Sequence, residues 1–352
     1  MYKISFKNDY SEGAHPRILE ILAHSNMEQM DGYGLDPYSL QAMELIRTQT
    51  GMPAAPVYIL SGGTQTNAIV ISHLLRPYQS VMAVNTGHIH MREAGAIEAT
   101  GHRVTIIPDR DGKVTPEDVA AALQQHPDEH CVQPALVYIS FPTETGLVYT
   151  REELHRLSDF CRHNKLLLYA DGARLGAGLT SPACDITLPE FARLVDAFYI
   201  GGTKNGALLG EAVVFSTPDL DTEFRRYIKQ HGALLAKGRL LGTQFVGLFE
   251  RTPENAPDST LFFRLAKHAN KMAAQMTATF NECGIDMLVP PQTNQLFPIL
   301  SNSMITELEQ KFDFFHWETI DSYRSAIRLV TSWATPEEHV EEWNRMFKYL
   351  TI

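Results

Sequence analysis

The chain has 352 residues, of which 44% are hydrophobic and 20% charged, which is typical of a soluble globular protein with a sizeable core. Its net charge of −11 disfavours nucleic acid or an anionic membrane surface as a partner. The four cysteines are widely spaced without a metal-binding pattern, and the sequence has neither an apolar signal core nor a membrane-spanning stretch. These features predict a cytoplasmic protein with free thiols and no metal site.

Residues 1–35 are polar and rich in turn-forming residues, with one short helix expected near Arg17–His24. We predict that they form an N-terminal segment close to the functional site. Asp36 and Pro37 then begin a helix that Gly51 ends, because Pro suits the first turn of a helix and Gly its end.

From residue 57 onward, apolar strands alternate with helices. The expected strands span 57–60, 80–84, 103–107, 135–141, 166–170 and 197–200. The helices between them comprise one that ends at Leu75 and others over 88–99, 115–125 and 151–163. This alternation predicts an α/β fold with a mostly parallel sheet and helices on both faces.

A domain boundary is predicted near residues 251–258, a polar stretch with two prolines. A long helix is expected over 259–283, strands over 293–299 and 325–331, and a closing helix over 336–349. The chain would therefore consist of a large domain over 36–252 and a small α+β domain over 253–352.

The first stretch with chemical character is Ser61-Gly-Gly-Thr-Gln-Thr-Asn67, which joins a strand to a helix. The free amides at such a helix start bind anions, so Gly63, Thr64 and Gln65 are candidates for a phosphate cradle. The stretch is neither a P-loop nor a dinucleotide fingerprint. A glycine turn of this kind is by itself a weak signal.

The second stretch is Asp171-Gly-Ala-Arg174, at the end of an apolar strand. A carboxylate at that position in an α/β protein points into the ligand crevice. Asp171 could hold a protonated heterocyclic nitrogen, and the Arg174 guanidinium could bind a carboxylate. The alternative is an aspartate that caps the next turn, with the arginine in a nearby salt bridge.

The third stretch is Gly201-Gly-Thr-Lys204, again after an apolar strand. Its glycines allow a tight turn that would present Lys204 to a cleft, where the amine loses its proton more easily and can form a Schiff base. For the lysine considered alone, a solvated loop residue is the better interpretation. The two stretches upstream favour the reactive lysine.

Together, the three stretches supply a phosphate cradle, a partner for a ring nitrogen and a Schiff-base lysine, the parts that a pyridoxal phosphate enzyme needs. The sequence here resembles the threonine aldolase and β-eliminating lyase group of fold-type I pyridoxal phosphate enzymes. The resemblance covers nearly the whole chain, from Asn8-Asp9 and Tyr33–Pro37 to Ile327–Thr331. It implies pyridoxal 5′-phosphate as cofactor, a mostly parallel seven-stranded sheet, a small C-terminal domain, and a homodimer or homotetramer with active sites at the interface.

The resemblance also implies roles for single residues. Lys204 would form the Schiff base, and Asp171 would hold the ring nitrogen. His88 would stack over the ring and help to deprotonate the substrate hydroxyl. Arg174 and Arg328 would bind the substrate carboxylate. An alternative for His88 is a metal pair with His90, which we disfavour because no nearby acid completes a ligand set.

Further substrate contacts are expected from Asn8, Tyr33 and Glu144. Asn8 stands where many relatives have a serine, and its amide can still donate a hydrogen bond. Phe141–Gly146 replaces an Asn-Thr-His stretch that many threonine aldolases carry, so Glu144 takes over that polar role or His88 acts without it. A basic residue within 225–239 could reach the phosphate across the dimer interface, although a solvated helix face is an equal alternative.

The implied reaction is the retro-aldol cleavage of L-threonine, L-allo-threonine or a related β-hydroxy amino acid to glycine and an aldehyde. The substrate would be a small amino acid. The alternatives on the same scaffold are a β-eliminating lyase and a phenylserine-type aldolase. Outside catalysis, the chain could be a non-catalytic pyridoxal phosphate-binding protein, but the presence of Asp171, Arg174 and Lys204 together speaks against that.

Overall fold

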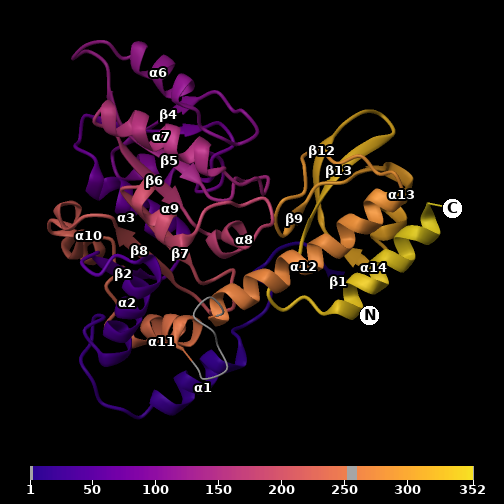
Figure 1. Ribbon diagram of the computed structural model, residues 1–352, viewed down its shortest axis with the longest axis horizontal. Helices are drawn as coiled ribbons and strands as arrows, with labels where there is room; N and C mark the ends of the chain where they lie inside the picture. The colour runs from indigo at the N-terminus through magenta and orange to yellow at the C-terminus, as the bar shows by residue number, and fades with distance from the viewer. Residues whose placement is uncertain (1–2, 252–259, 352) are drawn as a thin grey trace.

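The larger part of the protein is built on one seven-stranded sheet (Figure 1). The structure is a computed structural model that describes residues 3–251 and 260–351. The strands run in the order β2-β8-β7-β6-β5-β3-β4, and only β8 is antiparallel to its neighbours. Their bounds are β2 Val57–Leu60, β3 Gln79–Val84, β4 Arg103–Ile107, β5 Gln133–Ser140, β6 Leu167–Asp171, β7 Ala197–Gly201 and β8 Glu211–Phe215. The predicted mostly parallel α/β sheet is thus confirmed.

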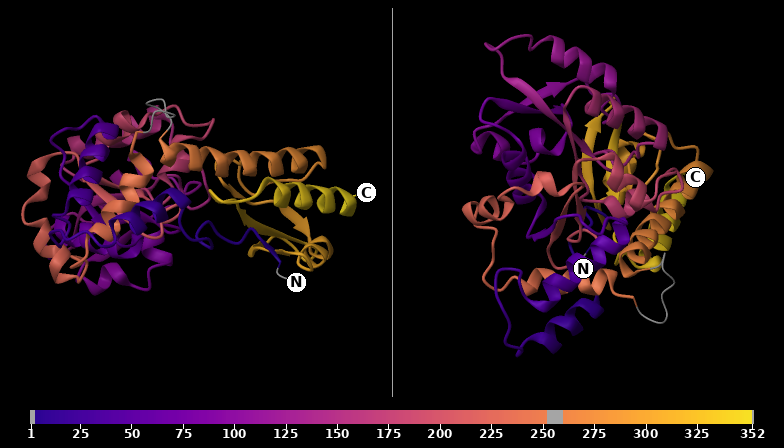
Figure 2. Two further views of the ribbon diagram at one scale, coloured as in Figure 1. Left: turned by 90° about the horizontal axis from the view of Figure 1, so that it is seen from below. Right: turned by 60° about the vertical axis from the view of Figure 1, so that its left-hand side comes forward.

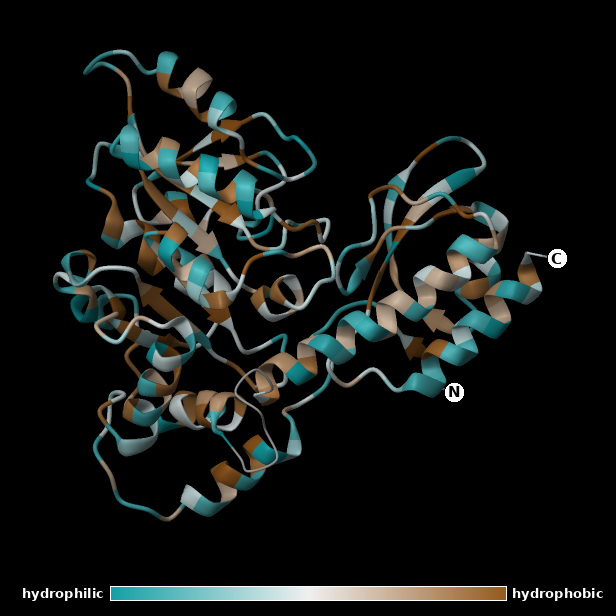
Figure 3. Ribbon diagram, in the orientation of Figure 1, coloured by the Kyte–Doolittle hydropathy of each residue, from teal (hydrophilic) through white to brown (hydrophobic). Residues whose placement is uncertain are grey.

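Helices cover both faces of this sheet because both faces are apolar (Figure 3). On β5, Leu136 and Tyr138 pack on one face, and Val137 and Ile139 on the other. The first face is covered by α3 (Gly63–Leu74), α4 (His88–Met91), α5 (Ala96–Ala99) and α10 (Phe224–Gln230). The second is covered by α1 (Pro16–Ser25), α2 (Pro37–Thr50), α6 (Pro116–Gln124), α7 (Arg151–His163), α8 (Leu175–Leu179), α9 (Leu188–Leu194) and α11 (Arg239–Phe249).

The predicted signals for helix ends work as expected in α2. Asp36 accepts a hydrogen bond from the Ser39 amide at 2.8 Å, with Pro37 at the first helical position. Gly51 ends the helix in the left-handed region at φ 64°. These local signals therefore place both ends of the helix correctly.

The C-terminal part packs beside the sheet and is joined to it by the long helix α12 (Leu261–Glu282) (Figure 2). It holds a four-stranded antiparallel arrangement and two more helices. The elements are β9 Gln295–Leu296, β10 Ile299–Ser301, α13 Asn302–Leu308, β12 Phe315–Thr319, β13 Arg324–Val330 and α14 Glu337–Leu350. The predicted domain boundary at 252/253 lies outside the described residues, so the division into domains remains a proposal.

The N-terminal segment contributes to both parts. Strand β1 (Ile4–Ser5) pairs in parallel with β11 (Phe312–Asp313), and Phe6 packs edge-on against Trp343 with ring centroids 5.6 Å apart. Asp9 then accepts a hydrogen bond from Arg174, shortly after β6, and Ile18 and Ile21 of α1 join the core on the second face of the sheet. No helix within the described ranges is long and apolar enough to cross a membrane.

Two predicted elements are wrong in detail. The helix expected over 88–99 is divided into α4 and α5, because Ala94 and Gly95 adopt left-handed backbone angles of φ 52° and 74°. The strand expected over 293–299 is interrupted at Pro298, which cannot donate a backbone hydrogen bond. Further elements that the sequence pattern did not predict are β1, β8, β11, β12, the 3₁₀-helix η1 (Pro218–Asp221) and the helices α8, α9, α11 and α13.

Candidate active site

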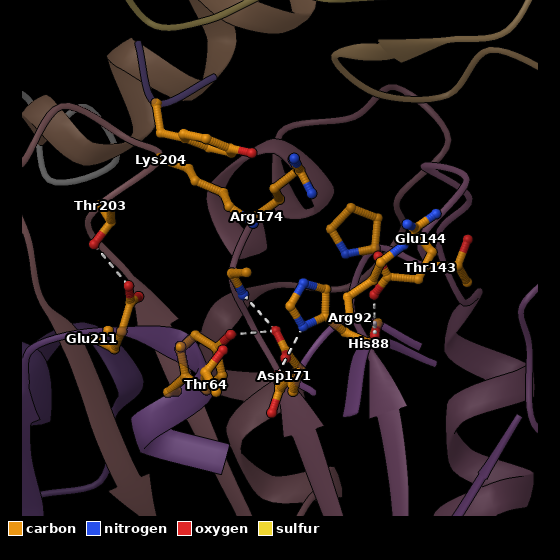
Figure 4. A pocket seen from close by; sticks show the side chains of 18 of the residues that line it. Thr64, His88, Arg92, Thr143, Glu144, Asp171, Arg174, Thr203, Lys204 and Glu211 are labelled. Atoms are coloured by element: carbon orange, nitrogen blue, oxygen red, sulfur yellow. Dashed lines mark hydrogen bonds and ion pairs between the residues drawn. The ribbon is translucent and has the colours of Figure 1, made fainter. Parts of the chain in front are cut away.

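A cavity of about 750 Å³ lies where the sheet meets the C-terminal part. The carboxyl ends of β2, β3, β5, β6 and β7 and the amino end of β8 converge there, which is where α/β proteins bind ligands. β12 and β13 form the opposite wall. Figure 4 shows Asp171, His88, Arg174 and Lys204, which come from different elements, facing this space.

Asp171 ends β6 and is buried at the floor of the cavity. Its Oδ1 accepts hydrogen bonds from the Tyr199 hydroxyl at 2.5 Å and the Ala173 amide at 3.0 Å. Its Oδ2 accepts from the Tyr138 hydroxyl at 2.8 Å and Asn67 Nδ2 at 3.0 Å. Burial alone would raise the pKa of Asp171, but the bonds from Tyr199 and Asn67 bring that pKa below its ordinary value. The carboxylate is therefore ionised and suited to hold a protonated ring nitrogen.

Lys204 follows β7 after a turn that only glycine allows, since a Cβ at Gly201 would lie 2.5 Å from the carbonyl oxygen of Ala173. Burial lowers the pKa of Lys204, and the positive charge of Arg174 lowers it further, against the opposing charge of Asp9. A larger share of the amine is thus neutral, as a nucleophile towards an aldehyde requires.

The glycine-rich turn lies at the amino end of α3. A Cβ on Gly63 would lie 3.1 Å from the Tyr199 hydroxyl, so the turn passes close to the cavity floor. The first amides of this 12-residue helix have no partner within the helix and can bind an anion. Thr64 lines the cavity, whereas Gln65 does not and instead accepts a hydrogen bond from Ser61 Oγ at 2.7 Å.

These groups fit pyridoxal phosphate. The helix start suits its phosphate, the ionised Asp171 its ring nitrogen, and the Lys204 amine its aldehyde. Four hydrogen bonds already fill the acceptor positions of Asp171. However, the Tyr138 hydroxyl also lies 3.3 Å from Ser140 Oγ, so Tyr138 can turn to Ser140 and leave one position for a ring N–H.

Two arginines approach the cavity from opposite sides. Arg174 donates its Nε and Nη2 to both oxygens of Asp9, at 2.7 and 2.9 Å. Arg328 donates Nε and Nη2 to Gln295 Oε1 at 3.2 and 2.5 Å. Burial, reinforced by the charge of Arg174, lowers the pKa of Arg328 to about 10. Because the two cations repel each other, an anion between them is favoured, and a substrate carboxylate would meet this need.

His88 begins α4 and lines the cavity. Its Nδ1 lies 2.8 Å from Glu93 Oε1, so an acid lies beside this histidine. The predicted Glu144 also lines the cavity, and its Oε1 accepts from Ser140 Oγ at 3.0 Å. Within the described ranges, no group of three or more His, Cys, Asp or Glu side chains is placed to hold a metal ion.

The structure does not bring Asn8 or Tyr33 to the cavity. Asn8 Oδ1 accepts hydrogen bonds from Tyr10 and Ser11 within its own turn. Tyr33 is 44% exposed on the surface, with Lys229 Nζ 5.0 Å from its ring centroid. Their roles as substrate contacts, like the phosphate contact expected from 225–239, remain predictions.

Sequence reasoning missed several residues of the cavity wall. Glu211 begins β8, is buried, and accepts a hydrogen bond from Thr203 Oγ1 at 2.8 Å. An acid that directly follows a glycine and precedes an apolar run was the available signal. Aromatic side chains also border the cavity from distant segments, namely Tyr10, Phe315 and Trp317. No local pattern marks these aromatic residues.

Residues 12–303 match the family model described as beta-eliminating lyase. The chain belongs to this family. The low specificity L-threonine aldolase of Pseudomonas aeruginosa is 29% identical over 97% of this chain and 96% of its own length. The structure of a threonine aldolase from Leishmania major is 46% identical, with a TM-score of 0.95 over 99% of this chain and 100% of that chain.

More distant structures support the same fold for this family member. Thermus thermophilus aspartate aminotransferase is 14% identical, and its structure matches with a TM-score of 0.69 over 99% of this chain and 91% of its own. At that identity the likeness concerns the fold alone. The expected fold-type I architecture and the expected family are both confirmed.

Proposed function

We propose that the protein uses pyridoxal phosphate to cleave L-threonine and L-allo-threonine to glycine and acetaldehyde. The observation that carries this proposal is the shared cavity of Lys204, the ionised Asp171 and the pair Arg174 and Arg328. The names of the relatives from Pseudomonas aeruginosa and Leishmania major point to the same reaction.

The cofactor would supply the electron sink that lets the Cα–Cβ bond break. Lys204 would hold it through the amine, Asp171 would keep its ring nitrogen protonated, and the amides at Gly63 and Thr64 would bind its phosphate. Glu211 also borders the cavity, and burial raises the pKa of this carboxyl well above its ordinary value. A neutral Glu211 would not repel a phosphate.

The remaining side chains would orient the substrate and move its protons. Arg174 and Arg328 would clamp the carboxylate and thereby fix the direction of the Cα–Cβ bond. His88 would take the proton of the β-hydroxyl group, with Glu144 on the same side of the cavity (Figure 4). Burial lowers the pKa of His88, but the hydrogen bond to Glu93 and the charge of Glu144 outweigh burial and raise this pKa.

A phenylserine-type substrate is the second candidate. The aromatic side chains of Tyr10, Phe315 and Trp317 border the cavity and could pack against an aryl group at Cβ. Trp317 is also held in place by Arg328, whose guanidinium carbon lies 5.8 Å from the indole centroid. We therefore expect the protein to accept bulky β-substituents as well as the methyl group of threonine.

The test is to incubate purified protein and pyridoxal phosphate with a panel of β-hydroxy amino acids and to quantify glycine and the aldehyde. Equimolar glycine and acetaldehyde from threonine would support the proposal. Ammonia and a keto acid instead would indicate β-elimination, and no turnover on any member would contradict the assignment. A homodimer or homotetramer in the cytoplasm completes the proposal.

A further inference from the structure

Behind His88 lie a buried amide and a buried carboxylate to which the roles above assign nothing. Asn67 lies in α3 and is fully buried, and the Glu93 side chain has no exposed surface. Asn67 Nδ2 donates to Glu93 Oε1 at 2.7 Å and to Asp171 Oδ2 at 3.0 Å. Asn67 Oδ1 accepts from the Tyr169 hydroxyl at 2.9 Å. The amide therefore joins the carboxylate behind His88 to the one proposed to hold the ring nitrogen.

This network determines which atoms carry protons. The two N–H groups of Asn67 point to Glu93 and Asp171, so both carboxylates act as acceptors there. Glu93 Oε2 is buried and has no hydrogen-bond partner among the described residues, so Oε1 makes both contacts of this carboxylate. Glu93 Oε1 also lies 2.8 Å from His88 Nδ1. Since Oε1 acts as the acceptor in this network, the hydrogen of His88 lies on Nδ1.

The backbone is shaped to bring Glu93 into this position. Ala94 follows at φ 52°, in the left-handed region that residues other than glycine rarely adopt, and Gly95 continues at φ 74°. The chain therefore leaves the helical path after α4. A continuous helix over 88–99 would not place the Glu93 carboxylate against His88 in this way, so the conformation at Ala94 is part of the arrangement.

We propose that Glu93 is a positioning residue that holds the proton of His88 on Nδ1, leaves Nε2 as the acceptor in the cavity, and is itself fixed to Asp171 through Asn67. This inference rests on the proposed function of His88. As the β-hydroxyl proton moves to Nε2, the proton on Nδ1 stays hydrogen-bonded to Glu93. The negative charge of Glu93 stabilises the resulting imidazolium.

Other charges also act on His88 and must be kept constant in any test. Asp171 faces it from β6, Glu144 from the segment after β5, and Arg92 lines the same cavity from the segment of His88 itself. Glu93→Gln changes none of these and keeps the shape of the side chain. Glu98→Gln offers a matched control, because Glu98 is an exposed glutamate five residues further on.

The experiment is nuclear magnetic resonance of the holoenzyme labelled with ¹⁵N in its histidines, with the His88 signals assigned by their loss in His88→Asn. Wild-type His88 should show the tautomer with its hydrogen on Nδ1. In Glu93→Gln the pKa of His88 should fall by about one unit and the tautomers should mix. Glu98→Gln should match the wild type, and Glu93→Asp, which keeps the charge, should retain most of the wild-type pKa.

The pH dependence of kcat provides a second test. A base must be neutral, so kcat should rise with pH through the pKa of His88. In Glu93→Gln this rising part of the pH profile should shift to lower pH. Its plateau should fall about tenfold to a hundredfold, with a smaller change in KM. A hydrogen on Nε2 in the wild type, or an unchanged His88 titration in Glu93→Gln, would overturn the inference even if kcat fell. If Glu93→Gln did not fold, the tautomer of His88 in the wild type would still test the inference. Failure of the wild type to cleave threonine would contradict only the proposed function, because the histidine signals do not depend on turnover.

Discussion

Burial and the nearby charge of Arg174 lower the pKa of Lys204. Lys204→Ala removes the only group proposed to bind the cofactor covalently. We expect the visible absorbance of the bound cofactor to disappear and turnover to fall by several orders of magnitude. Lys267→Ala, at an exposed position on α12, is the control and should keep both. A Lys204 variant that stays coloured and active would show that another amine does this work.

Arg328 has a different proposed role, because we assign it to the substrate rather than to the cofactor. A charge-assisted hydrogen bond is worth about 1.5–3 kcal/mol, so Arg328→Leu should lower kcat/KM about tenfold to 150-fold. Part of this loss should appear in kcat, since a loose clamp lets the Cα–Cβ bond rotate out of alignment. Spectroscopic titration with the cofactor should be unchanged.

The control for Arg328 is the amino alcohol obtained by reducing the threonine carboxylate. It offers the arginine no anion and should bind equally poorly to the wild type and to Arg328→Leu. If the substitution weakened the amino alcohol as much as threonine, Arg328 would support the fold instead, through its contacts with Gln295 and Trp317.

Among the strands, β8 joins the site through its first residue. The Thr203 hydroxyl, next to Lys204, donates to Glu211 at 2.8 Å and accepts from the Gly210 amide at 3.1 Å, so the turn after β7 is fastened to the start of β8. Burial raises the pKa of Glu211 above its ordinary value of 4.5, against the opposing effects of Thr203 and Lys204. The folded protein thus holds a proton on Glu211 at a pH where the unfolded chain has lost it.

This proton makes stability depend on pH. The contribution of Glu211 is fully present below its unfolded pKa and is lost as pH rises towards the folded pKa, because unfolding then releases the proton. In thermal melts at about pH 5 and about pH 8, Tm should fall less in Glu211→Gln than in the wild type. Glu98→Gln should follow the wild type. If Tm decreased equally between the two pH values in all three proteins, Glu211 would be ionised in the folded protein.

The elements also show what the sequence could reveal. Apolar runs before Asp171 and Lys204 predicted both strands and the position of both side chains, because each signal lies within a few adjacent residues. The break between α4 and α5 could not be predicted, since Ala94 takes a left-handed conformation that its residue type disfavours. Contacts such as Arg174 with Asp9 join residues 165 positions apart and exist only once the chain has folded.

For the molecule as a whole, the predicted contact between a second subunit and the cofactor phosphate depends on where the positive charges lie. The cations that line the described cavity are Arg92, Arg174, Lys204 and Arg328, together with His88 and His316 when protonated. We assign Lys204 to the cofactor aldehyde, and Arg174 and Arg328 to the substrate. Arg225 and Lys229 both contact Tyr33 on the surface, away from the cavity of their own chain. This distribution agrees with the proposal that the basic residues of 225–239, here called the basic run, bind the cofactor phosphate in the cavity of a partner subunit.

Subunit mixing tests this assignment. One variant carries Lys204→Ala, and the other replaces the basic residues of 225–239 by glutamine, so each alone should have little activity. In a mixed dimer, one site combines an intact Lys204 with the intact basic run of the other chain. After dissociation and random reassembly, about a quarter of the wild-type activity should return, because half of the dimers hold one complete site of two. Without dissociation no activity should return. If none returned after reassembly either, while size measurements showed mixed dimers, the basic run would act within its own chain or only in folding.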